Sequence, residues 1–188
     1  MFVTASDIAL LAQRDVGVAH NMVANVKSAK GVAPVLKMLK AGVRVGLGTD
    51  GAMSGNTVDV LGQLGYVAKL HKLDNKDRTV MPATEVVDLA TIGGARVLHR
   101  EAELGSLEAG KLADVIIVDT DSTAMTPLYE PATALVYAAS PRDVRTTVIH
   151  GRVVMEDRKL TTVDPVRIRA EVRRIARRVN EVVAAGVK

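Results

Sequence analysis

The sequence predicts an α/β protein, and two features of its first 72 residues carry that prediction. Segments with helical spacing of apolar residues alternate with short apolar runs, in the order helix, strand, helix, strand, helix. The runs are continuous rather than alternating, which is typical of a parallel sheet covered by helices on both faces. Two strands cannot bury themselves as a sheet, so we expect this half either to need partners or to belong to something larger.

Local signals justify each element of this first half. Thr4 or Ser6 can cap a first helix, and Pro34 suits the first position of a second helix that should end at Gly42. The expected helices are residues 8–13, a segment from Pro34 onward and residues 58–70, and the expected strands are residues 16–19 and 43–47.

The second half changes character after a charged connector at residues 73–80. Residues 83–98 are mostly helical in pattern, with a break at two glycines, and turn formers follow. Asp164 can cap a last helix, with Pro165 at its first position and apolar residues spaced four and three apart along one face. The expected strands are residues 113–118 and 134–138, then a hairpin over residues 144–149 and 153–155.

Composition excludes several classes of function. The 188 residues are 48% hydrophobic and 24% charged, as in soluble globular proteins, and the low aromatic content leaves a core of aliphatic residues and methionine. The absence of cysteine excludes disulfides and thiolate metal sites, and an aromatic content of 2% excludes a base-stacking platform for single-stranded nucleic acid. No apolar stretch is long enough to span a membrane and no signal peptide is recognisable, so we expect a cytoplasmic protein that does not bind membranes.

The net charge of +4 comes from one segment, because residues 167–178 hold six arginines and one glutamate. A basic segment can indicate nucleic-acid binding, but we expect the solvated face of an amphipathic helix and no nucleic-acid partner. The apolar face of that helix is expected to pack against the rest of the protein or against a second subunit.

Two strand ends carry groups suited to chemistry. His20 and Asn21 close the first strand, and Asp50 closes the second between Thr49 and Gly51. Functional residues of parallel α/β folds gather where strands end. Asp50 is therefore a candidate metal ligand or general base, with turn formation as the alternative. His20 is a weaker candidate, because a single strand-end histidine more often bonds its own loop.

The other histidines, His71, His99 and His150, have no metal-ligand spacing, and we interpret them as surface or packing residues. A catalytic zinc needs three protein ligands and an open position. The chain offers one good candidate and one doubtful one, so it cannot build that site by itself.

Several motifs resemble one known family. Residues 20–34 read HNMVANVKSAKGVAP, residues 42–59 read GVRVGLGTDGAMSGNTVD, and residues 105–114 read GSLEAGKLAD. Ala90-Thr91, Gly94-Ala95 and Gly151-Arg152 also fit. Together they resemble the metal-dependent amidohydrolase superfamily over about residues 5–160. The most similar branch contains the methylthioadenosine/S-adenosylhomocysteine deaminases and the chlorohydrolases.

The resemblance implies an α/β fold made of the C-terminal part of a (β/α)8 TIM-like barrel and the C-terminal portion of a small β-sandwich. The strands at residues 16–19 and 43–47 would be the seventh and eighth of the barrel. On this basis we expect a partial hydrolase barrel domain at residues 1–104, a sandwich portion at 105–162 and an amphipathic terminal helix at 163–188.

The resemblance also implies site roles. Asp50 matches the family's metal-binding aspartate, which activates the attacking water and shuttles its proton. His20 and Asn25 match positions of the pocket wall, so Asp50, His20 and Asn25 are expected to bind substrate. The implied cofactor is a divalent metal, zinc with iron as the alternative. The implied reaction is hydrolytic deamination of an aminopurine or related heterocycle, in a homo-oligomer.

The chain departs from the family pattern in ways that limit this expectation. The HxH pair after the first strand, the histidine and glutamate after the fifth and the histidine after the sixth have no counterpart here. Residues 22–24 also replace the usual proline and small polar residues of that loop. We therefore expect a C-terminal fragment that is inactive alone, or, as the alternative, a non-catalytic assembly or binding module derived from this family.

Overall fold

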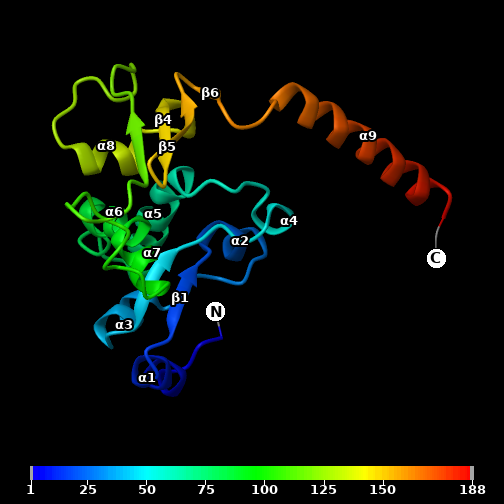
Figure 1. Ribbon diagram of the computed structural model, residues 1–188. Helices are drawn as coiled ribbons and strands as arrows, with labels where there is room; N and C mark the ends of the chain where they lie inside the picture. Colours follow the sequence, from blue (N-terminus) through cyan, green and yellow to red (C-terminus); the bar gives the residue numbers. More distant parts are fainter. Residues whose placement is uncertain (1, 187–188) are drawn as a thin grey trace.

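The computed structural model describes residues 2–186 and contains two sheets, the first of them surrounded by helices (Figure 1). Strands β1 (Gly17–His20) and β2 (Arg44–Leu47) pair in parallel, with His20 opposite Leu47. The predicted α/β class is confirmed. The helices of this half are α1 (Ala5–Gln13), α2 (Met22–Lys27), α3 (Val35–Lys40), α4 (Ala52–Gly55), the 3-10 turn η1 (Leu61–Gln63), α5 (Leu64–Asn75), α6 (Ala83–Ala90) and α7 (Ile92–Val97).

Helix α1 begins at a reciprocal cap that the sequence predicted in part. The Thr4 hydroxyl accepts a hydrogen bond from the Asp7 amide at 3.2 Å, and the Asp7 carboxylate accepts one from the Thr4 amide at 2.8 Å. Two amides at the helix start that lack partners within the helix are thereby satisfied. Thr4 is thus the cap, and Ser6 lies inside the helix.

Helix α7 lies directly on strand β2, and glycines make this possible. A side chain at Gly46 would place its Cβ 2.7 Å from the Cα of Gly94 on α7, closer than real Cβ contacts come. A Cβ on Gly93 would likewise lie 2.7 Å from the carbonyl oxygen of Val45 on β2, so Gly46 and Gly93 need to lack a side chain for the helix to reach the sheet at this depth. The sequence predicted a break in the helix at Gly93 and Gly94, but both glycines lie inside α7, where the helix contacts β2. The helical run divides at Thr91, between α6 and α7.

The second sheet is antiparallel, in the order β3-β4-β5-β6. Its strands are β3 (Val115–Val118), β4 (Val144–Ile149), β5 (Arg152–Glu156) and β6 (Lys159–Leu160). The predicted hairpin is confirmed as β4–β5, with Ile149 opposite Arg152.

The strand predicted at residues 134–138 is wrong, because residues 134–137 belong to helix α8 (Pro131–Tyr137) and Ala138 is its C-cap. The Glu130 carboxylate accepts hydrogen bonds from the amides of Ala132 and Thr133, at 3.2 and 2.6 Å, and Pro131 occupies the first turn. This cap and the proline set the start of a helix in a short apolar run that alone does not distinguish helix from strand. The 3-10 turn η2 (Pro141–Asp143) then leads into β4.

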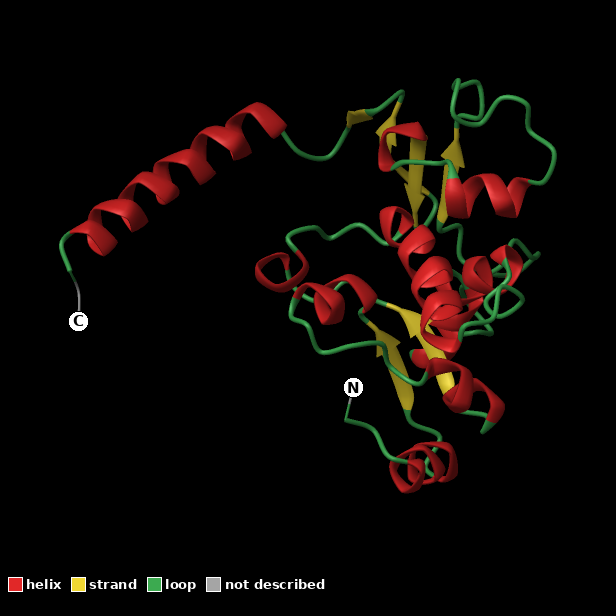
Figure 2. Cartoon of the chain, turned by 180° about the vertical axis from the view of Figure 1, so that it is seen from behind, coloured by secondary structure: helices red, strands yellow, loops and turns green. Residues whose placement is uncertain are grey.

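The core is built from aliphatic residues and methionine, as the composition predicted. Met22, Met38 and Met81 are at most 1% exposed and pack with valines from α3, α5 and α6. Helix α9 (Pro165–Ala184) takes no part in it: none of its residues is buried, and it extends away from both sheets in both views (Figures 1 and 2). Within residues 2–186 no helix is both long and apolar enough to cross a membrane.

Candidate active site

The carboxyl ends of β1 and β2 meet, which brings the two predicted strand-end groups together. The Gly48 amide donates to the His20 carbonyl at 3.1 Å, one residue beyond the paired strands. The Asn21 side chain fills the space beside Gly48, where a Cβ would overlap its Oδ1. The loop after β2 is therefore held against the end of β1, and a side chain at position 48 would displace the Asn21 side chain that contacts this loop.

Asp50 lies on this loop with its carboxylate exposed. Its backbone is in the left-handed region at φ 59°, where aspartate is among the few residues other than glycine that are tolerated. Its amide donates to Asn21 Oδ1 at 3.2 Å, and its own Oδ1 accepts from the Gly51 amide at 2.7 Å. Asp50 thus forms the turn, as the alternative interpretation held, and its other carboxylate oxygen has no hydrogen-bond partner within the described residues. The two roles are compatible.

His20 faces the interior rather than solvent. It is 2% exposed, and its Nε2 lies 3.2 Å from Nε2 of His71 on α5, which is 1% exposed. Burial, with the nearby His71, lowers the pKa of His20 to about 4, and burial also lowers the pKa of His71. Both rings are therefore neutral at neutral pH and share one hydrogen bond.

Nδ1 of His20 is buried and has no hydrogen-bond partner among the described residues. Orphaned buried donors are rarer than orphaned acceptors. The arrangement in which His20 Nε2–H donates to His71 is therefore favoured, since it leaves Nδ1 as a bare acceptor. His71 was interpreted from the sequence as a surface or packing residue. It is a packing residue with a specific polar partner. Its place on the same buried face of α5 as Leu64, Val67 and Ala68, one turn further along, was the available signal.

Helix α2 places Asn25 and Lys27 beside the same loop region. Asn25 is partly buried, and its amide donates to the Asn21 carbonyl at 3.1 Å in the first turn. Lys27 Nζ donates to the Ser54 carbonyl at 2.8 Å and to Asn56 Oδ1. Lys27, which the sequence did not single out as functional, thus ties α2 to the segment that follows Asp50.

The residues present do not by themselves form a metal site. No group of three or more histidine, aspartate or glutamate side chains in residues 2–186 is arranged to hold a metal ion. Asp50 is exposed and able to ligate, whereas His20 points toward His71.

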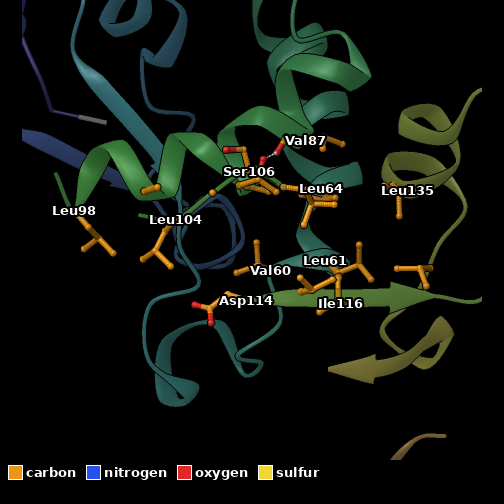
Figure 3. Close-up of a pocket in the computed structure, with 17 residues that line it drawn as sticks. Val60, Leu61, Leu64, Val87, Leu98, Leu104, Ser106, Asp114, Ile116 and Leu135 are labelled. Atoms are coloured by element: carbon orange, nitrogen blue, oxygen red, sulfur yellow. Dashed lines mark hydrogen bonds between the residues drawn. The ribbon is translucent and has the colours of Figure 1, made fainter. Parts of the chain in front are cut away.

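A separate cavity of about 620 Å³ lies between α5–α7 and strand β3 (Figure 3). Leu61, Leu64 and Ile116 point toward it, and its polar lining groups already have partners. Asp114 accepts from the His150 amide at 2.6 Å, and Ser106 bonds Lys111 Nζ at 2.6 Å. The cavity is apolar, and Asp50 is not among its lining residues.

Comparison with known proteins gives a consistent result. Residues 1–154 match the model of the Amidohydrolase family. The chain is 49% identical over 171 residues to a 5-methylthioadenosine/S-adenosylhomocysteine deaminase from Syntrophobacter fumaroxidans, covering 91% of this chain and 39% of that protein. It is 40% identical to a 5'-deoxyadenosine deaminase from Methanosarcina acetivorans, covering 94% of this chain and 40% of that protein.

Solved structures are similar too. An adenosine deaminase from Xanthomonas campestris with bound zinc superposes with a TM-score of 0.91 at 33% identity, over 96% of this chain and 41% of the other. An atrazine chlorohydrolase from Arthrobacter aurescens, complexed with zinc, superposes with a TM-score of 0.82 at 29% identity, over 88% of this chain and 37% of the other. The chain spans about two fifths of the length of the proteins it matches.

Proposed function

Since the chain belongs to the amidohydrolase family, we propose that it supplies the Asp50 side of the active site of a metal-dependent hydrolase that deaminates adenosine-like substrates. In this proposal β1 and β2 are the last two strands of a barrel, and β3 to β6 are its share of a β-sandwich. The observation that carries the proposal is the exposed Asp50 carboxylate at the joined ends of two parallel strands, in a chain 49% identical to a deaminase.

Asp50 is proposed to act as general base. Its Oδ1 is oriented by the Gly51 amide, which leaves the other oxygen to accept a proton from the attacking water. A divalent metal, zinc in this proposal, would use Asp50 as one ligand and lower the pKa of water. The other ligands would come from residues outside this chain, so no catalytic step through the metal is assigned to the residues described here.

His20 and Asn25 are proposed to shape the wall of the substrate pocket beside Asp50. His20 would act through the position of its ring, because its Nε2 is engaged by His71 and the ring is almost fully buried. Asn25 is on the first turns of α2, which the Asn21 carbonyl holds at the end of β1. The full enzyme is proposed to be a cytoplasmic homo-oligomer acting on a small heterocyclic substrate.

One observation favours a second function for the chain alone, as a non-catalytic assembly or binding module. Its described residues provide no group of three metal ligands. We therefore expect the isolated 188-residue chain to bind zinc weakly and to show no turnover of an adenosine analogue. Zinc content after dialysis and ammonia release test this together. Tight stoichiometric zinc with turnover in the isolated chain would refute it.

The role of Asp50 is tested in a chimera that joins this chain to the part of the Syntrophobacter fumaroxidans deaminase outside the matched region. Asp50→Asn keeps the size of the side chain but cannot accept the proton, so we expect turnover to fall about 10²–10⁴-fold with an unchanged circular dichroism spectrum. Asp88→Asn, the same change on the exposed face of α6, is the matched control and should be neutral. Activity of the Asp50→Asn chimera within a few-fold of the parent would return Asp50 to a turn-forming role only.

A further inference from the structure

Helix α9 presents a continuous apolar face that nothing in the described chain covers. Its 20 residues span about 30 Å at the rise of an α-helix. The residues of this face are each between 47% and 57% exposed and recur at intervals of four and three, which is the spacing of one helix side: Ile168, Val172, Ile175, Val179 and Val182. A regular apolar stripe of this length on an extended helix indicates a macromolecular contact rather than a solvated arm.

The direction of α9 is shared with a solved enzyme. Helix α9 holds 20 of the 188 residues, so a superposition that misplaced it would leave more than a tenth of the chain unmatched. The TM-score of 0.91 over 96% of the chain against the Xanthomonas campestris adenosine deaminase excludes such a mismatch. In that enzyme the matching helix therefore leaves the second sheet in the same direction as α9. About three fifths of the length of that enzyme lies outside the match.

The charge of α9 argues against a second copy as the partner. The helix carries six arginines and two glutamates, and within the described residues its ion pair is between Arg174 and Glu171, at 2.6 Å. Two such helices packed side by side would bring together two net charges of the same sign within about 10 Å, a separation that physiological salt screens only in part. By helical spacing Arg178 and Glu171 border one edge of the apolar stripe and Arg169 borders the other, so the complementary surface is apolar at its centre and carries mainly carboxylates at its edges.

We infer that the apolar face of α9 binds a polypeptide surface of the kind formed by the three fifths of the amidohydrolase relatives that this chain does not span. The contact buries the five apolar residues in a groove and pairs the bordering arginines with acidic side chains. The contact fixes α9 against that surface. The inference rests on family membership and on the geometry of α9, and it does not depend on the identity of the substrate.

Binding is tested by expressing the tagged 188-residue chain together with the unmatched part of the Syntrophobacter fumaroxidans deaminase and measuring co-purification. Ile175→Glu places a charge in the centre of the stripe and is expected to lower recovery at least tenfold. Ala170→Glu introduces the same residue on the opposite, exposed face of α9 and is expected to leave recovery unchanged. Equal recovery of the two variants would overturn the inference. So would a dimer of the chain alone that Ile175→Glu dissociates.

A second measurement does not require the separate part to be soluble. In the chimera described above, backbone amides of α9 are expected to exchange with deuterium at least tenfold more slowly than in the isolated chain, because packing suppresses local opening. Equal exchange rates in the two proteins would overturn the inference. Neither readout uses turnover, so failure of this contact and failure of the proposed deaminase activity are distinguishable.

Discussion

The buried pair of His20 and His71 makes the stability of this chain depend on pH, and the size of the effect follows from the pKa of His20. That pKa falls from an ordinary value of 6.5 to about 4 in the folded protein. Between these pH values the unfolded chain binds more protons than the folded one. The contribution of His20 to the free energy of unfolding is therefore fully present above pH 6.5 and is lost as the pH falls toward 4. From pH 7 to pH 5 the linkage relation gives a loss of about 2 kcal/mol from His20. His71, whose pKa is also lowered, adds to the loss in the same direction.

The measurement is urea unfolding of the isolated chain followed by circular dichroism at intervals between pH 5 and 7, a window chosen because it lies above the range in which carboxylates titrate. His20→Gln removes the titrating group and is expected to flatten the dependence by about 2 kcal/mol across the window. His150→Gln, the same change at an exposed turn, should leave the dependence as it is. A parent protein with no loss of stability between pH 7 and 5, or an equal slope in His20→Gln, would refute the burial argument.

Three further outcomes are expected. Gly46→Ala should cost about 1–3 kcal/mol of unfolding free energy in urea, because its Cβ would meet the backbone of α7, whereas Gly51→Ala has open space and should be near neutral. Lys27→Met should speed deuterium exchange of the backbone amides in the α4 segment, because the two hydrogen bonds from Lys27 to that segment are lost. Lys37→Met, at an exposed position of α3, should leave this exchange unchanged. Duplex DNA and RNA should bind more weakly than micromolar in about 150 mM salt, as measured by fluorescence anisotropy; tight, salt-sensitive binding would contradict the assignment of the arginines to a protein contact.

The elements that the sequence predicted well are those whose signals are local. The first cap at Thr4, the two apolar strands and the β4–β5 hairpin each depend on neighbouring residues. Helix α8 was mistaken for a strand because its start is set by Glu130, whose carboxylate bonds two amides ahead of the apolar run. Helix α2 was not anticipated, since its six residues have neither a side-chain cap nor a clear apolar period.

The part of the candidate site that could be predicted is the part that depends on the direction of the two strands. Parallel strands bring their carboxyl ends to one edge, so the proximity of His20, Asn21 and Asp50 followed from the strand assignment. The burial of His20 against His71 did not, because 51 residues separate the two and no spacing motif joins them. Asp50 as metal ligand, and His20 and Asn25 as substrate-binding residues, stay predictions, and Asp50→Asn in the chimera tests the catalytic role of Asp50.

The methionine core has a chemical consequence of its own. Met22, Met38 and Met81 are shielded from solvent, whereas Met53 on α4, three residues after Asp50, is 94% exposed. Oxidation of a thioether to the sulfoxide follows access to the sulfur and makes the side chain polar. Mild peroxide should therefore mark Met53 first and leave the fold intact. The three core sulfurs should react only when the chain unfolds, so the ratio of core to Met53 oxidation in a mass spectrum reports how often this chain unfolds.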